Sequence, residues 1–482
     1  MNLKTNLKAR IAAFHFLLFT LLIILVPLLK GFAIPASGPV ILYVDADATA
    51  GSNDGTTWAN AYVDLQSALA AVHADCDIWV AKGTYKPTIY TSIISRSESF
   101  NIPDSVRVYG GFAGNEIASY NLDLRDFNVN TTILSGDIGV VGSTSDNSYN
   151  VIKTSNVTDK NIVDGFTIRD GNANYESVSI FNDNGAGWYN EASGSGKMSN
   201  PRVRNCIFLE NFADHGGAGM SNYGTSLGEA GAILENCVFE GNLTSGLGGG
   251  LYFSGLTDNV PCKMYNVAFL GNRSDSYSAF GGGCFITNNS GNNMPEMLNC
   301  TFQSNLARFG GGLFLRVLGG TLNPTITNSV FWGNRAFAYD PDDVRSGIQS
   351  DGGASFSLAY SLLQDSTITS NGNISGTTDP KLFNVLSNPF STPSLKADFR
   401  LLPCSPLINA GTNTGITAND VYNKPRNING TVDIGAYEYR GNTSSTIIYV
   451  NKDALNWGDG TSWLTAYNKI NEALNPNYAL GF

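Results

Sequence analysis

FQSNLARFGGGLFL, at residues 302–315, joins an F-x-x-N unit to three glycines and a short apolar run. The F-x-x-N unit occurs five times, with successive copies 29 to 33 residues apart, and glycine-rich runs follow four of them. Its phenylalanines are Phe208, Phe239, Phe269, Phe302 and Phe331. An internal repeat of about 30 residues is typical of solenoid proteins, in which each repeat forms one coil.

Strand-like patterns fill the repeat. Runs of β-branched and aromatic residues lie between Gly, Asn, Ser and Asp turns, without helical periodicity. PTITNSVFW, residues 324–332, is expected to form a single strand with two alternating faces, Ile326, Asn328, Val330 and Trp332 against Thr325, Thr327, Ser329 and Phe331. We therefore predict an all-β fold: a right-handed parallel β-helix, with coils about 4.8 Å apart and a short N-terminal capping helix.

Equivalent positions of successive coils stack in a β-helix, so each repeated residue type predicts a column. The phenylalanines would form an aromatic column, and the Cys, Val and Ser residues two positions before them a column of small side chains. The asparagines of F-x-x-N would form a hydrogen-bonded ladder at a corner with left-handed backbone. This structural ladder comprises Asn211, Asn242, Asn272, Asn305 and Asn334. The glycines would allow the next corner to turn tightly.

The two ends of this region lack the repeat. We predict a β-helix domain over residues 40–440, with a cap at 41–75, regular repeats from about 160 to 335 and a C-terminal end from about 379 to 440. In the cap, residues 61–72 have helical spacing, and DIWVAKGTY from Asp77 is the expected first strand. After a linker at 441–446, residues 447–482 contain DGTSWLTAY, which matches DGTTWANAY of the cap. We expect the truncated start of a second module there.

Residues 1–33 have the composition of a secretory signal peptide. A basic start precedes an apolar stretch from Ile11 to Leu29, and small residues favour cleavage after Ala33 or Ala36. An uncleaved membrane anchor is the alternative. The net charge is −11, and loss of the signal, with its four basic and no acidic residues, would make it −15. Such a chain repels nucleic acid and anionic lipid, so we expect no nucleic-acid partner and no membrane span in the mature chain.

The paired F-x-x-N and GG-apolar units resemble the repeats of polymorphic outer-membrane proteins, the chlamydial-type adhesins. The YVDADATAGSNDGTTW start and the DFRLLPCSPLINAG and GTVDIGAYEY segments are similar to the ends of secreted bacterial β-helix proteins, including those of the choice-of-anchor type. Together these resemblances cover most of the chain after the signal. They imply a secreted, cell-surface or outer-membrane protein of a bacterium that is often adhesive, with a host or cell-surface glycan or protein as partner.

Right-handed β-helices also carry polysaccharide lyases and glycoside hydrolases, so catalytic groups have to be sought. A lyase needs a basic residue near carboxylates that hold a metal. The loop YDPDDVRSGIQSDGG offers weak catalytic candidates, Asp342, Asp343 and Arg345, and weak Ca²⁺ ligands, Asp340, Asp342, Asp343 and Asp351. A solvated acidic loop is the alternative interpretation. We expect no cofactor, with Ca²⁺ bound in this loop as the alternative.

Other patterns indicate structure rather than chemistry. The seven cysteines include no C-x-x-C pair and no His-Cys cluster, so neither a zinc site nor a dense disulfide framework is expected. Three of them share one repeat slot, which predicts buried thiols. Asp137, Asp164 and Asp170 are spread over early coils, whereas a glycosidase needs two facing carboxylates. His215 is expected in a turn.

The sequence thus predicts an exported β-helix protein that acts in adhesion or in glycan or protein binding, through its long sheet faces and the loops between coils. A lyase or glycosidase on the same scaffold is the first alternative. A structural spacer within a larger surface protein is the second.

Overall fold

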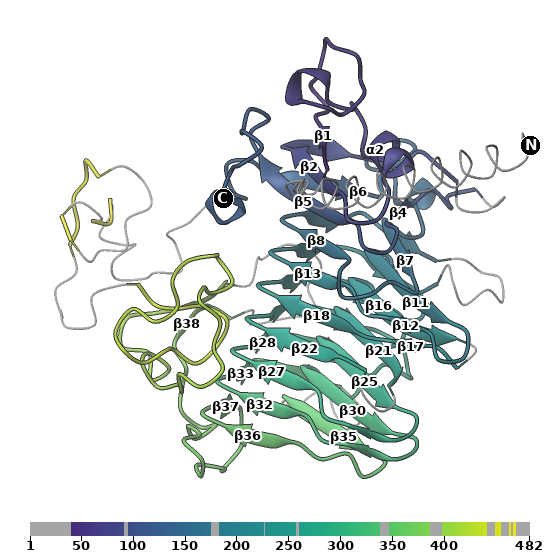
Figure 1. Cartoon of the computed structure of the whole chain (residues 1–482). Helices are drawn as coiled ribbons and strands as arrows, with labels where there is room; N and C mark the ends of the chain where they lie inside the picture. Colours follow the sequence, from purple (N-terminus) through teal and green to yellow (C-terminus); the bar gives the residue numbers. More distant parts are fainter. Residues whose placement is uncertain are drawn as a thin grey trace, which may run out of the picture. The chain divides into compact units, whose positions relative to one another are not determined.

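The computed structural model describes residues 40–90, 95–174, 183–225, 227–256, 260–337, 347–385, 398–440, 449–454, 462–463 and 466–468. Apart from Val40, they belong to one compact unit, Ile41–Phe482. This unit is a parallel β-solenoid of about nine turns (Figure 1), which confirms the predicted all-β parallel β-helix. The predicted signal peptide and the linker 441–446 lie outside the described residues. Among the described residues, no helix has the length and apolar character that a membrane span requires.

Four parallel sheets run along the solenoid. Sheet 1 has ten strands: β1 (Ile41–Val44), β2 (Asp77–Ala81), β5 (Arg107–Phe112), β8 (Ile162–Asp164), β13 (Arg202–Arg204), β18 (Ala232–Glu235), β22 (Cys262–Tyr265), β27 (Glu296–Leu298), β32 (Thr325–Thr327) and β36 (Ser357–Ala359). Sheet 2 has nine: β3 (Gly83–Tyr85), β6 (Thr132–Ser135), β9 (Thr167–Arg169), β14 (Ile207–Leu209), β19 (Val238–Glu240), β23 (Ala268–Leu270), β28 (Thr301–Gln303), β33 (Val330–Trp332) and β37 (Leu362–Leu363).

Sheets 3 and 4 complete the coil. Sheet 3 has six strands: β10 (Asn172–Ala173), β15 (Phe212–Ala213), β20 (Leu243–Thr244), β24 (Arg273–Ser274), β29 (Leu306–Ala307) and β34 (Arg335–Ala336). Sheet 4 has eight: β4 (Phe100–Asn101), β7 (Ile152–Ser155), β11 (Trp188–Ser193), β16 (Met220–Thr225), β21 (Leu251–Leu256), β25 (Cys284–Asn288), β30 (Leu313–Val317) and β35 (Ile348–Asp351).

Short elements occur beside these sheets. Two parallel pairs are β12 (Met198–Ser199) with β17 (Glu229–Ala230) and β26 (Asn292–Asn293) with β31 (Thr321–Leu322), and one antiparallel pair is β38 (Leu382–Asn384) with β39 (Asp398–Leu401). The helix α2 (Leu65–Ala71) and the 3₁₀ turns η1 (Trp58–Asn60), η2 (Leu122–Leu124) and η3 (Thr144–Asp146) are the helical elements of the described residues.

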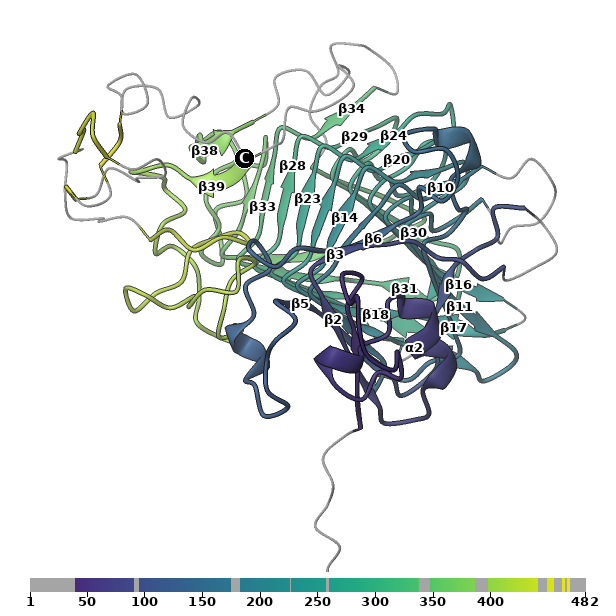
Figure 2. The ribbon, with the colours of Figure 1, turned by 90° about the horizontal axis from the view of Figure 1, so that it is seen from above.

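Strict register turns the repeat into columns. Phe208 lies opposite Phe239, and Phe239 lies opposite Phe269 in the next coil. Figure 2 shows β14, β23, β28 and β33 of this sheet in one row. The five repeat phenylalanines are fully buried, and successive ring centroids are 4.5, 5.0, 4.5 and 4.4 Å apart. The predicted aromatic column is therefore confirmed.

Each regular coil has several residues with left-handed backbone, including one in the glycine run, and two of these residues lie at the corners on either side of the repeat phenylalanine. The first is the asparagine three residues before each repeat phenylalanine, with φ of 49°, 55°, 53°, 54° and 50° at Asn205, Asn236, Asn266, Asn299 and Asn328. The second is the residue before the F-x-x-N asparagine, which is Glu210, Gly241, Gly271, Ser304 or Gly333. The expectation of left-handed backbone at the F-x-x-N asparagine itself was wrong, because its neighbour makes the turn.

The corner at Asn328 contradicts the prediction of a single strand across PTITNSVFW. The left-handed φ of Asn328 separates β32 from β33 and interrupts the alternation of faces. Ile326 and Phe331 both point inward as a result, each fully buried in the main core cluster. The residues of this stretch therefore do not share two faces as predicted.

The N-terminal cap contains a strand that the sequence did not suggest. DIWVA was expected to be the first strand, but β1 precedes it and pairs with β2 in parallel. The chain between them covers the outer edge of β1, where Tyr43 N donates to the Gly55 carbonyl over 2.9 Å. Helix α2 begins at Asp64, whose carboxylate accepts from Ser67 N over 2.7 Å, and it packs Leu65 and Leu69 onto the end of the core.

Residues 449–468, as far as they are described, repeat contacts of this cap. Val450 bridges Tyr467 as Val44 bridges Tyr62. The Tyr449 and Trp463 rings lie 5.0 Å apart at 66°, and the Tyr43 and Trp58 rings 4.8 Å apart at 60°. The matching sequences thus have matching local structure, whereas the rest of the predicted second module lies outside the described residues.

Candidate functional site

The acidic loop predicted as a catalytic or Ca²⁺ site is largely outside the described residues. Asp340, Asp342, Asp343 and Arg345 all fall in the undescribed range 338–346. Asp351 is described at the exposed end of β35, where its carboxylate lies 3.2 Å from Arg316 Nη2 and accepts from Gly352 N over 2.7 Å. In the described part of the chain, no three His, Cys, Asp or Glu side chains are grouped so that they could hold a metal ion.

The other candidate side chains occupy separate structural positions. Asp164 is buried with Arg125, 3.0 Å away, and Asp137 lies 3.4 Å from Lys86 Nζ. Asp170 accepts from Ser135 Oγ over 2.7 Å. His215 is exposed, and its Nδ1 lies 3.0 Å from Asn184 Oδ1. Asp137 N also donates to Ser135 Oγ over 3.2 Å, so Asp137 and Asp170 lie on either side of this hydroxyl, and the carboxylate of each is paired with a basic side chain, Lys86 and Arg169.

The asparagines of the predicted ladder lie in one buried column. The side-chain amide of each donates to the Oδ1 of the next, over 3.0 Å from Asn211, 2.9 Å from Asn242, 3.0 Å from Asn272 and 2.8 Å from Asn305. Gly171, in the equivalent slot of the preceding coil, donates its backbone N–H to Asn211 over 3.0 Å. The column joins coils and offers no free group to a ligand.

The cysteines are thiols without disulfide partners, and six of the seven are buried. Cys206, Cys237 and Cys300 lie in the repeat slot inside the coils, as predicted. Burial raises the pKa of Cys206 and Cys300 to about 12 and raises that of Cys237 as well. These thiols stay protonated and unreactive at neutral pH.

A non-repeating C-terminal segment, residues 398–440, forms a wall beside sheet 2 (Figures 1 and 2). It packs on the outward face of β23, β28 and β33. Leu270 packs with Phe399 and Val421, and Val330 packs with Leu407 and Ile434. The outward side chains of β23 and β33 are apolar, which explains why a chain segment covers them, whereas those of β28 are polar and bind the segment through hydrogen bonds, such as that from Ala436 N to Thr301 Oγ1 over 2.9 Å.

The segment is held by the corner asparagines, a role that we did not anticipate. Asn266 Nδ2 donates to the Asn419 carbonyl over 2.8 Å, and Asn299 Nδ2 donates to the Asp433 carbonyl over 3.1 Å. Asn328 binds Thr412 twice: its Nδ2 donates to the Thr412 carbonyl and its Oδ1 accepts from Thr412 N, both over 2.8 Å. The sequence signal was the asparagine three residues before each repeat phenylalanine, which we had interpreted only as part of the coil.

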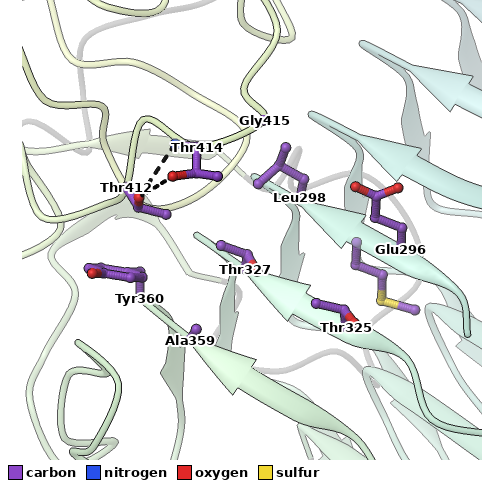
Figure 3. A pocket seen from close by; sticks show the side chains of 10 residues that line it. Glu296, Leu298, Thr325, Thr327, Ala359, Tyr360, Thr412, Thr414 and Gly415 are labelled. Carbon is purple, nitrogen blue, oxygen red and sulfur yellow. Dashed lines mark hydrogen bonds between the residues drawn. The ribbon is translucent and has the colours of Figure 1, made fainter.

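Between this segment and sheet 1 lies a cavity of about 420 Å³, which we call the threonine hollow (Figure 3). It is lined by Glu296, Met297, Leu298, Thr325, Thr327, Ala359, Tyr360, Thr412, Thr414 and Gly415. Figure 3 shows Thr412 and Thr414 on the loop across from β32, the strand that carries Thr325 and Thr327. Sequence reasoning missed it because its two walls are about 85 residues apart in the chain.

Hydroxyl groups and one carboxylate face the hollow. Thr412 Oγ1 donates to Thr414 Oγ1 over 3.3 Å. Glu296 accepts from Tyr265 Oη over 2.7 Å, and its carboxylate lies 3.4 Å from Lys263 Nζ, so its charge is balanced at the rim. Burial and this hydrogen bond to Glu296 raise the pKa of Tyr265. The lining therefore suits a neutral ligand with many hydroxyl groups, which can exchange hydrogen bonds with it and rest apolar faces on Leu298 and Tyr360.

A second cavity, of about 460 Å³, lies on the outward face of sheet 4 near its N-terminal edge. We call it the lysine hollow; it is lined by Asn101, Ile102, Pro103, Lys153, Thr154, Ser155, Tyr189 and Glu191. Register places Lys153 beside Tyr189 on the neighbouring strand. Burial lowers the pKa of Lys153 to about 8, against the opposing effect of Glu191. Glu191 accepts from Thr225 Oγ1 over 3.0 Å. The hollow thus combines an amine that is partly neutral in mildly alkaline solution with a phenol and a carboxylate.

No family model matches the chain, and no curated protein matches its sequence. Among solved structures, the chain is similar to one titled "Crystal structure of pectate lyase Pel9A", with 15% sequence identity and a TM-score of 0.38. That similarity covers 84% of this chain and 98% of the other. It concerns the fold and carries nothing about substrate or catalytic residues.

Proposed function

We propose that this protein is exported to the cell surface or the extracellular space of a bacterium, where it binds a neutral glycan in the threonine hollow. The carrying observation is the lining of that cavity, in which Thr325, Thr327, Thr412 and Thr414 face one another across an apolar floor. Short hydroxyl side chains on fixed backbone are well suited to sugar hydroxyls, because little side-chain entropy is lost on binding.

Several features support this proposal over a structural spacer. A spacer needs only the coils, whereas this chain positions a separate loop through Asn328 and directs two hydroxyls of that loop toward sheet 1. The signal-like residues 1–33 and the acidic composition favour export and a neutral or cationic partner. The adhesin-like repeats suggest the same surroundings.

Binding to a panel of polysaccharides tests the proposal. We expect mannan, galactan or cello-oligosaccharides to bind, and polygalacturonate and alginate to bind less well. Thr327→Val removes one lining hydroxyl and should weaken binding by about 2- to 10-fold, the equivalent of one net hydrogen bond. Thr84→Val is the matched control, because Thr84 is an exposed strand threonine of the first coils. The proposal fails if no neutral glycan binds, or if Thr84→Val weakens binding as much as Thr327→Val.

The lysine hollow favours a second candidate function, a polysaccharide lyase. In such a reaction the neutral Lys153 amine would remove the proton next to a uronate carboxylate, the C–O bond to the neighbouring sugar would break, and its electron pair would leave with the oxygen as a carbon–carbon double bond forms. Tyr189 is placed to return a proton to the leaving oxygen. The substrate would be an acidic polysaccharide, in contrast to the ligand of the threonine hollow.

Incubation with polygalacturonate and alginate, with and without Ca²⁺, tests this second candidate. Unsaturated products should appear faster as the pH rises toward and through about 8, because the base has to be neutral. Lys153→Ala should abolish them. Products that survive this change but disappear in an Asp342→Ala, Asp343→Ala chain would assign the activity to the acidic loop instead.

A further inference from the structure

The wall of the threonine hollow contains a buried group of charged side chains, which we call the charge cluster. It comprises Asp420, Arg426, Asp433, Glu438 and Arg440. The first four are at most 1% exposed. No other part of the described chain buries so many ionisable groups together, and none of the functions considered above uses them.

Hydrogen bonds within the cluster organise the whole segment. Arg426 Nη2 donates to the carbonyls of Gly435 and Ala436 over 3.1 and 2.6 Å, and its Nη1 lies 3.7 Å from Glu438 Oε2. Asp420 Oδ2 accepts from Glu438 N over 3.1 Å and from Arg440 Nη2 over 2.8 Å. The backbone around the cluster does not need to form strands. Its N–H and carbonyl groups bind the charged side chains, whereas those of a coil bind the backbone of the neighbouring coil.

The cluster is connected to the loop of the threonine hollow. Asp433 Oδ1 accepts from Asn409 N over 2.7 Å. The neighbouring Val432 carbonyl accepts from Gly411 N over 2.9 Å, and Val432 N donates to Asn413 Oδ1 over 3.1 Å. Residues 409–413, which carry Thr412 into the hollow, are thus fixed on both sides by the backbone around Asp433.

The charges of the cluster do not balance when every group is ionised. Three carboxylates and two guanidinium groups leave one net negative charge. Four of the five side chains are buried and Arg440 is 27% exposed, so burial of this unbalanced charge is costly. One bound proton brings the cluster to neutrality. Burial and then the charge of Asp433 raise the pKa of Glu438 to about 8, and burial raises that of Asp433 to about 6.

The groups that face the cluster from other elements stay neutral. The Cys300 thiol, on the corner leading into β28, has its pKa raised to about 12 by burial. Tyr422 and Tyr437, within the same segment as the cluster, also stay neutral, because burial raises the pKa of both phenols. The proton balance of the cluster therefore depends on its own carboxyl groups.

We propose that one proton held by the charge cluster controls the threonine hollow: while it is bound, the segment holds Thr412 and Thr414 opposite β32, and its loss loosens them. The control of ligand binding rests on the proposed function, glycan binding in the hollow. The loosening of the segment does not depend on that function. The bound proton thus allows the hollow to bind its ligand at neutral and mildly acidic pH, and loss of the proton weakens binding at alkaline pH.

The direction follows from linkage. A carboxyl group whose pKa in the folded segment exceeds its ordinary value favours the folded segment at low pH, and this contribution is lost as the pH rises through the folded value. For Glu438 the loss extends from the ordinary range of a glutamate up to about pH 8. Above about pH 8, Glu438 no longer stabilises the folded segment in this way, and its effect on stability does not change further with pH.

Hydrogen exchange of the full chain tests the conformational step. Protection of the amides of 409–415, divided by that of the coil strands β11 and β16 in the same sample, should fall at least about 10-fold between about pH 6 and about pH 9. Glu438→Gln keeps an uncharged group in place and should abolish this fall. Glu235→Gln, on the outward face of sheet 1 beside Arg204, is the matched control and should leave the fall intact. An unchanged ratio in the native chain, or a fall that persists in Glu438→Gln, overturns the proposal.

Binding of mannan and cello-oligosaccharides at the same two pH values tests the consequence for the hollow. We expect the native chain to bind these glycans at about pH 6 and more weakly at about pH 9. In Glu438→Gln the affinity should be the same at both pH values. Equal binding at both pH values by the native chain overturns the control of the hollow. Absence of binding at both values, together with the expected exchange result, refutes the proposed function and supports the proton-controlled segment.

Discussion

The regular coils and the C-terminal segment solve the same physical problem in different ways. Both contain irregular corners with backbone groups that need partners away from water. In the coils each group is satisfied by the equivalent residue of the next coil, as in the asparagine column from Asn211 to Asn334. The segment has no equivalent neighbour. Its backbone groups bind buried charged side chains and the corner asparagines of the coils instead. Stability in the coils is therefore distributed over many similar contacts, whereas in the segment it depends on a few dissimilar ones.

The largest effect should come from a break in the aromatic column. Phe208→Ala removes a fully buried ring that lies 4.5 Å from Phe239, and the lost packing and the cavity should cost about 3–5 kcal/mol. Denaturant unfolding followed by circular dichroism measures this. Ile207→Ala is the matched control, because Ile207 is 39% exposed on the other face of the same strand. If both changes cost the same, the column is not what stabilises the coils.

A change in the charge cluster should damage the segment and leave the coils folded. Arg426→Met leaves the surrounding carboxylates without their buried cation, which should cost about 3 kcal/mol or more. Limited proteolysis should then cut within 398–440, while circular dichroism keeps the β-sheet signal. Lys424→Met, at an exposed position of the same segment, should remain resistant. Global unfolding of Arg426→Met would show that coils and segment are one cooperative unit.

An intermediate effect is expected for the asparagine column. Asn305→Ala removes an amide that donates to Asn334 Oδ1 over 2.8 Å and to the Phe269 carbonyl over 2.9 Å. Loss of these buried partners should lower the free energy of unfolding by about 1–3 kcal/mol and leave glycan affinity unchanged. Asn115→Ala, in an exposed loop, serves as control. A weaker affinity in Asn305→Ala would mean that the column has a role beyond the coils.

The same contrast explains what could be predicted from the sequence. The period of about 30 residues, Phe208 to Phe331, contains both the strand pattern and its register, so the all-β parallel fold followed from it. The strand β1 was missed because ILYV lies outside the repeat of about 30 residues, and the single strand predicted across PTITNSVFW ignored the turn at Asn328. The threonine hollow could not be predicted, because Thr327 and Thr412 are brought together only by packing of a segment that has no repeat.

The smallest difference in stability, between variants of two equivalent corners, should be the most informative about the hollow. Asn328 and Asn236 occupy equivalent corners with φ of 50° and 55°, so replacement by alanine costs each the same backbone strain of about 1 kcal/mol. Only Asn328 also holds Thr412, through two hydrogen bonds of 2.8 Å, whereas Asn236 Nδ2 donates to Asn205 Oδ1 within the coils. We expect Asn328→Ala and Asn236→Ala to lose similar stability by denaturant unfolding, and glycan affinity to fall only in Asn328→Ala. The two corners differ in that Asn328 binds Thr412 of the segment. If both variants bind glycan with equal affinity, the ligand lies away from the segment, on the sheet faces of the coils.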